Sequence, residues 1–368
     1  MKVIATKESL SYGVQVVQKA VSGKSPLPIL SGILLQAKDN LLKITGTDLD
    51  IGIECNIPVT VAEEGSVVVP AKYFNEIVKK LPDTKIEIDL KKENNQIIIK
   101  YGQSEINING LPAEDYPMLP VIDKDYSITL KGNLFKSMIK QTVFASSFDN
   151  ARPVFTGCLM DIKEDELNLV ATDTHRLAYR RVKIDNQGSL ANHSIIIPAK
   201  TLVEVNRLIN EETEVTVSIT ENQILFEMDE ISLISRLIEG QFPNYRQVIP
   251  TEFKSKVRIK TKDLLESAER ASLMAREGSS VIKISVEDYN MTISSNSPEI
   301  GKIQENLPVF LDGDGTQISF NSKYFTDVLK VIESEEVNLE LTGSLSPGIV
   351  KPVENNNFIY LILPVRTI

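Results

Sequence analysis

The sequence predicts an α+β fold built from three copies of one module, each with two helices and antiparallel strands. Two observations support this prediction. A stretch that begins at Val69 returns at Ile197 and again at Phe320, so the repeat spacing is about a third of the 368-residue chain. Around each copy, segments with helical or alternating periodicity return in the same order.

The repeated stretch has the pattern of an amphipathic helix. In each copy a lysine is followed four residues later by an acid and seven residues later by a second cation. The three sets are Lys72, Glu76 and Lys79; Lys200, Glu204 and Arg207; and Lys323, Asp327 and Lys330. A single helix of this kind would carry only a surface ladder of ion pairs, each worth ~0.2–0.5 kcal/mol. Three copies in register favour a surface shaped for a partner.

Each module begins with a helix and continues with a strand pair, the repeated helix and further strands. Helices are predicted over residues 7–20, 70–81, 131–146, 198–210, 261–276 and 321–332. The strand pairs share a turn signature that begins at Leu42, Leu167 and Met291. Later segments alternate apolar and polar residues, and we expect roughly seven or eight strands per module in hairpin order.

Proline-bearing segments at 111–117 and 242–245 close the first two modules, and we place the linkers near 121–127 and 249–256. The domains are predicted as follows: N-terminal 1–122, central 123–251 and C-terminal 252–368. Two helices cannot cover the faces and edges of so much sheet, so we expect the modules to pair edge to edge. A ring closed by three modules of one chain and a ring of six modules from two chains both remain open.

The composition, 42% hydrophobic and 24% charged, is that of a soluble globular protein. No apolar run approaches the ~18–20 residues of a membrane-spanning helix, and the N-terminal segment lacks the apolar core of a signal peptide. Two isolated cysteines, Cys55 and Cys158, predict neither a disulfide framework nor a metal site. We therefore expect a cytoplasmic protein with no membrane partner, metal or cofactor.

The charge is distributed unevenly along the chain. The net charge of −10, taken alone, disfavours nucleic acid as a partner. Five of the six predicted helices are nevertheless net positive and the sixth is neutral, so the negative charge lies outside the helices. A protein that binds a polyanion on one side and repels it elsewhere would have this pattern.

No catalytic motif is evident in the sequence. It has no phosphate-binding glycine-rich loop and no nucleophile elbow, and its two histidines are His175 and His193. Asp173 and His175 would share a face of a strand, as an acid–base pair requires, only if the chain between them were straight. The other interpretations of His175 are a surface histidine and a contact to a partner.

A break in the repeat favours the partner contact. Where the other modules have Leu49-Asp50 and Pro298-Glu299, the central module has His175-Arg176, followed by Arg180-Arg181. A module that changes charge at one position, against its own copies, has the pattern expected for a binding surface.

Several motifs in combination resemble the bacterial β sliding clamps, the beta subunits of DNA polymerase III. They are 171–178 (ATDTHRLA), 27–30 (LPIL) and 363–366 (LPVR), and the resemblance extends over the full length. It implies a DNA-clamp fold that closes as a head-to-tail homodimeric ring of six similar domains around duplex DNA. The implied function is that of a non-enzymatic processivity factor that tethers the replicative polymerase and other replication and repair proteins.

The resemblance also implies partners and site residues. The partners would be double-stranded DNA without sequence preference, the DNA polymerase III alpha subunit, the clamp loader and other proteins with a clamp-binding motif. The partner-peptide pocket maps to Arg152, Phe155, Thr172, Thr174, His175, Arg176, Leu177, Pro243, Arg246, Val248, Tyr324, Leu361, Leu363, Pro364, Val365 and Arg366. Taken alone, Leu177, Val248 and Leu361 could equally be domain-core residues.

The DNA-facing residues would be Lys24, Lys72, Lys79, Lys80, Lys136, Lys140, Lys200, Arg207, Lys323 and Lys330, although several of these could be merely solvated. The dimer interface would contain Tyr73, Ile77, Leu81, Ile106, Ile108, Leu273, Met274, Glu299, Ile300 and Lys302. There, the edge strand 104–109 would meet 299–303 of the other chain, and the alternation of both segments suits half-buried strands.

Two other classes of function remain open on the sequence alone. One is a cytosolic enzyme that uses Asp173, His175 and Arg176 as a site for an acidic substrate. The other is a structural scaffold with no role on DNA. Replacing His175 would abolish turnover in the first case, and neutralising the helix cations would change nothing in the second.

Overall fold

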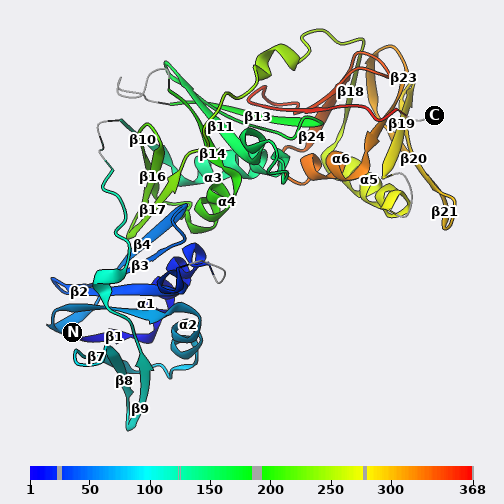
Figure 1. Cartoon of the computed structure of the whole chain (residues 1–368). Helices are drawn as coiled ribbons and strands as arrows, with labels where there is room; N and C mark the ends of the chain where they lie inside the picture. The colour runs from blue at the N-terminus through cyan, green and yellow to red at the C-terminus, as the bar shows by residue number, and fades with distance from the viewer. Residues whose placement is uncertain (23–26, 123, 125, 185–192, 277–279, 367–368) are drawn as a thin grey trace. The chain divides into compact units, whose positions relative to one another are not determined.

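The computed structural model describes residues 1–22, 27–122, 124, 126–184, 193–276 and 280–366. Contacts divide the chain into two compact units, Met1–Phe135 with Glu204–Leu237 and Lys136–Val203 with Ile238–Ile368 (Figure 1). Of the three divisions, the first two fall inside helices α3 (Gly132–Thr142) and α4 (Ala199–Leu208), and the third follows Leu237. They fall there because the strands of the central module are distributed between two large sheets.

The first unit is built on two antiparallel sheets. The larger has the order β10-β15-β16-β17-β4-β3-β2-β6, with β2 (Gly32–Lys38), β3 (Leu41–Thr47), β4 (Ile51–Pro58), β6 (Gly65–Pro70), β10 (Ser127–Lys131), β15 (Glu214–Ile219), β16 (Gln223–Met228) and β17 (Ile231–Arg236). The smaller has the order β5-β1-β7-β8-β9, with β1 (Lys2–Thr6), β5 (Thr60–Glu63), β7 (Lys85–Lys91), β8 (Gln96–Tyr101) and β9 (Ser104–Asn109). Helix α1 (Lys7–Val17) packs on β3 and β4 and against α2 (Ala71–Lys80).

The second unit repeats this plan. Its large sheet has the order β14-β11-β12-β13-β26-β25-β24-β18-β22, with β11 (Gly157–Lys163), β12 (Glu166–Thr172), β13 (Arg176–Lys183), β14 (His193–Pro198), β18 (Ser255–Lys260), β22 (Phe310–Gly313), β24 (Glu336–Leu341), β25 (Gly348–Pro352) and β26 (Phe358–Ile362). Its small sheet has the order β21-β20-β19-β23, with β19 (Val281–Glu287), β20 (Asn290–Ser297), β21 (Gly301–Pro308) and β23 (Thr316–Asn321). Helix α5 (Thr261–Arg276) covers β20 and β21 and packs against α6 (Ser322–Leu329), as Figure 1 shows.

The six predicted helices are confirmed, with ends that differ by a few residues. Short 3-10 turns at Gln18–Ala20 and Val143–Ala145 complete the first and third of them. The repeated helix buries the same position in each module, since Phe74, Leu202 and Phe325 are each 0% exposed. The helical periodicity of the sequence thus reports a real core face.

The strands are slightly more numerous than expected. Among the described residues the three modules have nine, eight and nine strands, against the seven or eight predicted. The additional strands include β5 and β22, which are four residues long. A four-residue edge strand is too short for alternation to stand out in the sequence.

Backbone pairing joins neighbouring modules, as the shortage of helices predicted. In the first unit β4 pairs with β17, with Gly52 opposite Ile234. In the second unit β13 pairs with β26, with Leu177 opposite Leu361. In the described part of the chain, no helix has the length and apolar character needed to cross a lipid bilayer.

Candidate functional site

The turn between β12 and β13 determines how the residues at the start of β13 are presented. Thr174 has a φ of 77°, a left-handed conformation that is uncommon for a residue other than glycine. The Asp173 carboxylate accepts the backbone N–H groups of His175 and Arg176 at 3.0 and 3.1 Å. The Thr172 hydroxyl donates to the Arg176 carbonyl oxygen at 2.6 Å. Asp173 therefore holds a kinked turn and is not the acid of an acid–base pair with His175.

The corresponding turn of the first module has the same hydrogen bonds. Leu49 has the φ of 77° that Thr174 has in the central module. With this register, Ile51 of the first module is the counterpart of Arg176 in the central module. The sequence comparison that aligned Arg176 with Asp50 was therefore wrong by one residue, because it departed from the 125-residue spacing of the turn signatures that begin at Leu42 and Leu167. The central module differs by having a cation where the first module has an aliphatic side chain.

The Arg176 side chain is buried, and each of its three nitrogens has a partner. Nε donates to the Asp173 carboxylate at 3.0 Å, Nη1 to Asp327 at 2.7 Å and Nη2 to the Phe144 carbonyl oxygen at 2.8 Å. The guanidinium also lies 4.2 Å from the ring centroid of Tyr324. Because Tyr324 and Asp327 belong to α6, Arg176 fastens the start of β13 to that helix.

A pocket of about 210 Å³ lies beside Arg176, over the paired strands β13 and β26. Leu177 and Leu361 are its buried apolar residues from those strands. Phe155 and Phe242 form an aromatic wall with ring centroids 6.4 Å apart. The mostly apolar lining suits aliphatic or aromatic side chains of a ligand rather than a reacting group.

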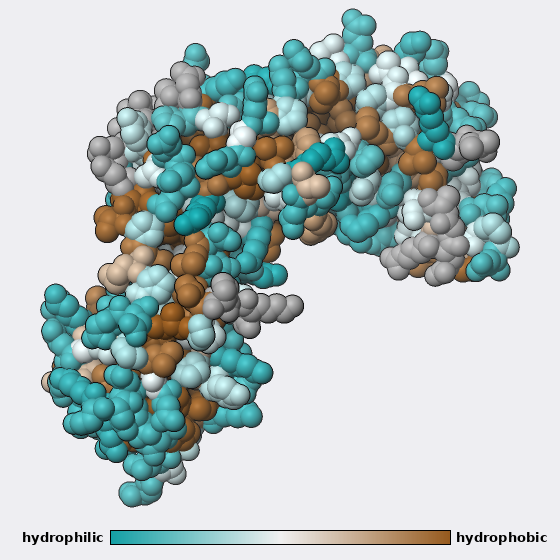
Figure 2. Space-filling model, viewed as in Figure 1, coloured by the Kyte–Doolittle hydropathy of each residue, from teal (hydrophilic) through white to brown (hydrophobic). Residues whose placement is uncertain are grey.

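The rim of the pocket is open to solvent. Val248 is 53% exposed and Leu363 is 38% exposed. Hydrophilic residues cover most of the visible surface of both units, and apolar residues gather in patches (Figure 2). Exposed apolar side chains around an apolar pocket are typical of binding surfaces.

The pocket brings together much of the set predicted from the sequence. Nine of the sixteen predicted residues line it: Phe155, Thr172, Thr174, Arg176, Leu177, Pro243, Val248, Leu361 and Leu363. Arg152 lies over the Phe155 ring at 5.4 Å, and His175 stacks on Tyr324 with centroids 6.5 Å apart, so these three border the lining. Pro364, Val365 and Arg366 continue the chain beyond Leu363, outside the lining.

Arg246 points elsewhere, toward Tyr245 and Asp161. Sequence reasoning also missed three lining residues, Phe242, Asn244 and Tyr245. The signal was present, since 242–245 had been singled out as the segment that closes the central module. Its aromatic residues on both sides of a proline could have been assigned to the pocket.

The equivalent position in the first unit is filled. Gly52 stands where the second unit has Leu177, and the Leu119 side chain packs directly onto it. A Cβ atom on Gly52 would lie 2.4 Å from Leu119 Cδ2. A pocket of about 260 Å³ remains at this junction, and its lining contains Leu119 and Ile234 as well as the charged side chains of Lys43, Glu54 and Lys124. The second unit is therefore distinguished by the almost wholly apolar lining of its pocket, and not by the presence of a pocket at the strand junction.

Comparison with known proteins accounts for the whole chain. Three family models match in order, the N-terminal, central and C-terminal domains of the DNA polymerase III beta subunit, at residues 1–120, 129–244 and 246–366. The chain belongs to the DNA polymerase III beta subunit family. It is 40% identical to the beta sliding clamp of Bacillus subtilis, with 100% of each chain covered.

Solved structures of beta clamps share the fold. A crystal structure of the DNA polymerase sliding clamp from Bacillus subtilis gives a TM-score of 0.96 at 39% identity, with both chains covered in full. The DNA polymerase III beta subunit from Thermotoga maritima gives 0.92 at 29% identity, also with full coverage of both chains. The fold is thus the three-domain α+β clamp fold, and the function is that of a non-catalytic processivity subunit of DNA polymerase III.

The cations expected to face DNA in this clamp-family chain differ in their surroundings. Lys24 lies outside the described residues. Four of them form salt bridges: Lys140 with Glu333 at 3.1 Å, Arg207 with Glu204 at 2.7 Å, Lys323 with Asp327 at 2.7 Å and Lys330 with Glu269 at 3.0 Å. The predicted ladder of ion pairs is therefore present in part.

Helix α2 presents a different arrangement. Lys72, Lys79 and Lys80 are exposed, and within the described residues no carboxylate lies at salt-bridge distance from them. The remaining two predicted cations, Lys136 and Lys200, have other interactions. Helix α2 thus offers the most available positive charge of the set.

The two segments expected at a clamp dimer interface are both sheet edges. β9 is the last strand of its sheet in the first unit, and β21 is the last strand of its sheet in the second. Tyr73, Leu273 and Ile300 are 63%, 54% and 55% exposed, whereas Leu81 and Ile108 are already buried within one chain. A partner would therefore bury mainly the first three side chains.

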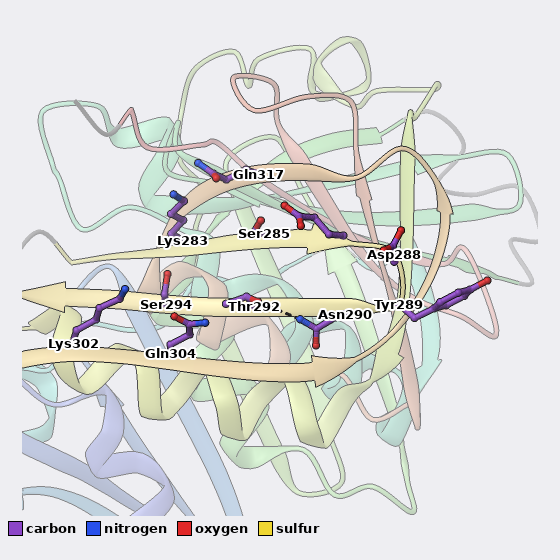
Figure 3. A pocket seen from close by; sticks show the side chains of 11 residues that line it. Lys283, Ser285, Asp288, Tyr289, Asn290, Thr292, Ser294, Lys302, Gln304 and Gln317 are labelled. Carbon is purple, nitrogen blue, oxygen red and sulfur yellow. Dashed lines mark hydrogen bonds between the residues drawn. The ribbon is translucent and has the colours of Figure 1, made fainter.

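A broad concave surface of about 700 Å³ lies on the small sheet of the second unit. It is lined by hydroxyl, amide and charged side chains of β19, β20, β21 and β23 (Figure 3). Lys283 and Lys302 lie toward one end and Asp288 and Tyr289 toward the other. A polar face of this kind is what an antiparallel sheet turns to water when its other face carries a helix.

Replacing Arg176 with methionine should lower the free energy of unfolding of the second unit by up to about 3–5 kcal/mol. Asp173 would lose its counter-ion, and Asp327 would keep only the exposed Lys323. Urea unfolding followed by circular dichroism measures this loss. Arg258→Met is the matched control: its surface pair with Glu336, at 3.5 Å and 50% exposed, should contribute less than about 1 kcal/mol. Equal losses in the two variants would contradict the structural role of Arg176.

Proposed function

We propose that two copies of this chain close head to tail into a ring that encircles duplex DNA and slides along it. The observation that carries the proposal is the opposition of sign between the cationic helices and the rest of a chain whose net charge is −10. A cationic lining would attract the phosphates, and an acidic exterior would repel DNA from other surfaces. Because phosphate contacts contain no sequence information, such a ring would have no preferred register on the duplex.

Ring closure in this proposal uses the two sheet edges. β9 of one chain would pair with β21 of the other, which would give each edge the backbone partners that it lacks within a single chain. Leu273 and Ile300 would cover Tyr73 of the partner chain, so that three large exposed apolar side chains become buried.

The apolar pocket over β13 and β26 would hold an extended peptide of a partner protein. We infer that its partners are the DNA polymerase III alpha subunit, the clamp loader and other replication and repair proteins that contain a clamp-binding motif. Leucine and phenylalanine side chains of the peptide would fill the space above Leu177 and Leu361. These partners act in the cytoplasm, and the buried free thiols of Cys55 and Cys158 fit that reducing compartment.

The sequence had left two other classes open. A metabolic enzyme is set aside by the family membership, and the Asp173 carboxylate on which it would depend is occupied by the turn and Arg176. Neutralising the helix cations distinguishes a clamp from a scaffold with no role on DNA, because only a clamp would then bind DNA more weakly.

Neutralising the α2 cations tests the DNA-facing role. The triple variant Lys72→Ala, Lys79→Ala and Lys80→Ala should bind duplex DNA more weakly. The steepness of log K against log salt should fall by up to roughly 5, since a ring of two chains loses six cations and each phosphate contact contributes about 0.9. Fluorescence anisotropy with a labelled duplex over a range of salt concentrations measures both changes.

The control triple replaces three exposed strand lysines, Lys38, Lys91 and Lys283, and so removes the same charge. It should leave the salt dependence nearly unchanged. Equal weakening in the two triples would show that only total charge matters, and no effect in either would favour the scaffold.

A charge placed in the rim of the pocket tests the peptide site. Val248→Asp should weaken the binding of a labelled peptide with Leu and Phe anchors at least tenfold, because a carboxylate would be desolvated against those anchors. Leu345→Asp is the control, since Leu345 is 68% exposed and lies outside the lining. Isothermal titration gives both affinities, and an unchanged affinity for Val248→Asp would exclude this pocket as the peptide site.

A further inference from the structure

A second pocket, of about 380 Å³, lies directly beside the apolar one. It is built from β11, β14 and the segment 240–246. The two pockets share four consecutive residues, 242–245, which line both. Three Cα–Cα steps span at most about 11 Å, so only a short ridge separates the two.

The two pockets differ in chemistry. The first is mostly apolar, whereas the second contains Asp161, Lys163 and Arg246, with neutral polar side chains and the apolar Leu159 and Ile196. Lys163 lies 3.8 Å and Arg246 3.6 Å from the Asp161 carboxylate. One carboxylate therefore faces two cations, and the second pocket has an excess of one positive charge.

The Asp161 carboxylate is buried and hydrogen-bonded, but the side chains of Lys163 and Arg246 remain accessible to solvent. The Asp161 side chain is 6% exposed and accepts the Tyr245 hydroxyl at 3.1 Å. Arg246 donates from Nε to the same hydroxyl oxygen at 3.1 Å. The side chains of Lys163 and Arg246 are nevertheless 52% and 50% exposed. A further carboxylate from outside could thus approach both cations without displacing Asp161.

Tyr245 fixes the ridge between the pockets. Its ring packs on that of Tyr179 with centroids 5.6 Å apart, and its hydroxyl group joins the Asp161 network. Tyr179 in turn donates to Asn168 at 2.8 Å, within the same sheet. The cationic pocket is therefore held at a fixed offset from the apolar one.

We propose that this pocket receives an acidic side chain from the segment that flanks the apolar anchors of the bound partner peptide, with Lys163 and Arg246 as the residues that select for it. The inference rests on the proposed peptide site. An extended peptide rises about 3.3 Å per residue, and the two pockets share the wall formed by 242–245, so an Asp or Glu within a few residues of an anchor reaches the second pocket. Since the cations are half-exposed, this recognition adjusts specificity among partners while the apolar anchors supply most of the affinity.

The test compares labelled peptides that have the same Leu and Phe anchors and carry either Glu or Gln in the flank, placed on each side of the anchors in turn. One placement should bind the protein about 3–10-fold more tightly with Glu than with Gln, and added salt should reduce this preference. In Lys163→Gln, Arg246→Gln and the double variant, the ratio of the two affinities should fall toward 1.

Lys183→Gln, which replaces an exposed lysine of the same sheet outside the pocket, should keep the full preference. Equal binding of Glu and Gln peptides in both placements would overturn the inference and leave the peptide site intact. A preference that survives in both Lys163→Gln and the double variant would also overturn it, because the acid would then be recognised elsewhere. Failure of every peptide to bind would instead contradict the proposed peptide site itself.

Discussion

The pairing of β13 with β26 is the interaction on which the functional part of the second unit depends. It joins segments about 180 residues apart in the chain into one sheet, with Leu177 opposite Leu361. The backbone extends this pairing, since Leu363 N–H donates to the His175 carbonyl oxygen at 2.9 Å. Arg176 supports it from the helix side through Asp327 and Tyr324. A module with two helices cannot cover its sheet, and this pairing is how the chain satisfies that constraint.

The repeat explains the site by where its copies differ. The two strand junctions share the same kinked turn and the same register, but the first has Gly52 under Leu119 and the second has Leu177 under an open pocket. The second junction has Arg176 where the first has Ile51, and this buried charge has to be paired. A small number of differences within a repeated framework therefore gives the second junction a pocket with a more apolar lining than the first.

Much of the architecture could be predicted from the sequence, because helices and alternating strands are local and periodic. The six helices and the edge pairing follow from such patterns. The counterpart of Arg176 could have been found, since the turn signatures that begin at Leu42 and Leu167 lie 125 residues apart and so pair Arg176 with Ile51. The kink at Thr174 could not be predicted, because nothing in its residue type indicates a left-handed backbone. The contact of Leu119 with Gly52 and the hydrogen bond of Tyr245 with Asp161 join residues far apart in the chain. A single sequence does not specify such pairs. Phe242 and Tyr245, by contrast, lie in the proline-bearing segment 242–245 that the sequence indicates, and they could have been assigned to the pocket.

The most direct test of the account is to measure solution mass by light scattering and, on the same sample, retention on circular and linear duplex DNA. A sliding ring of two chains should have a mass near twice 41.0 kDa, and it should stay on closed circles and be lost once they are linearised. That result would establish ring closure and sliding together. A monomer that binds both forms alike, with an affinity that falls steeply with salt, would contradict it and leave an ordinary electrostatic DNA binder.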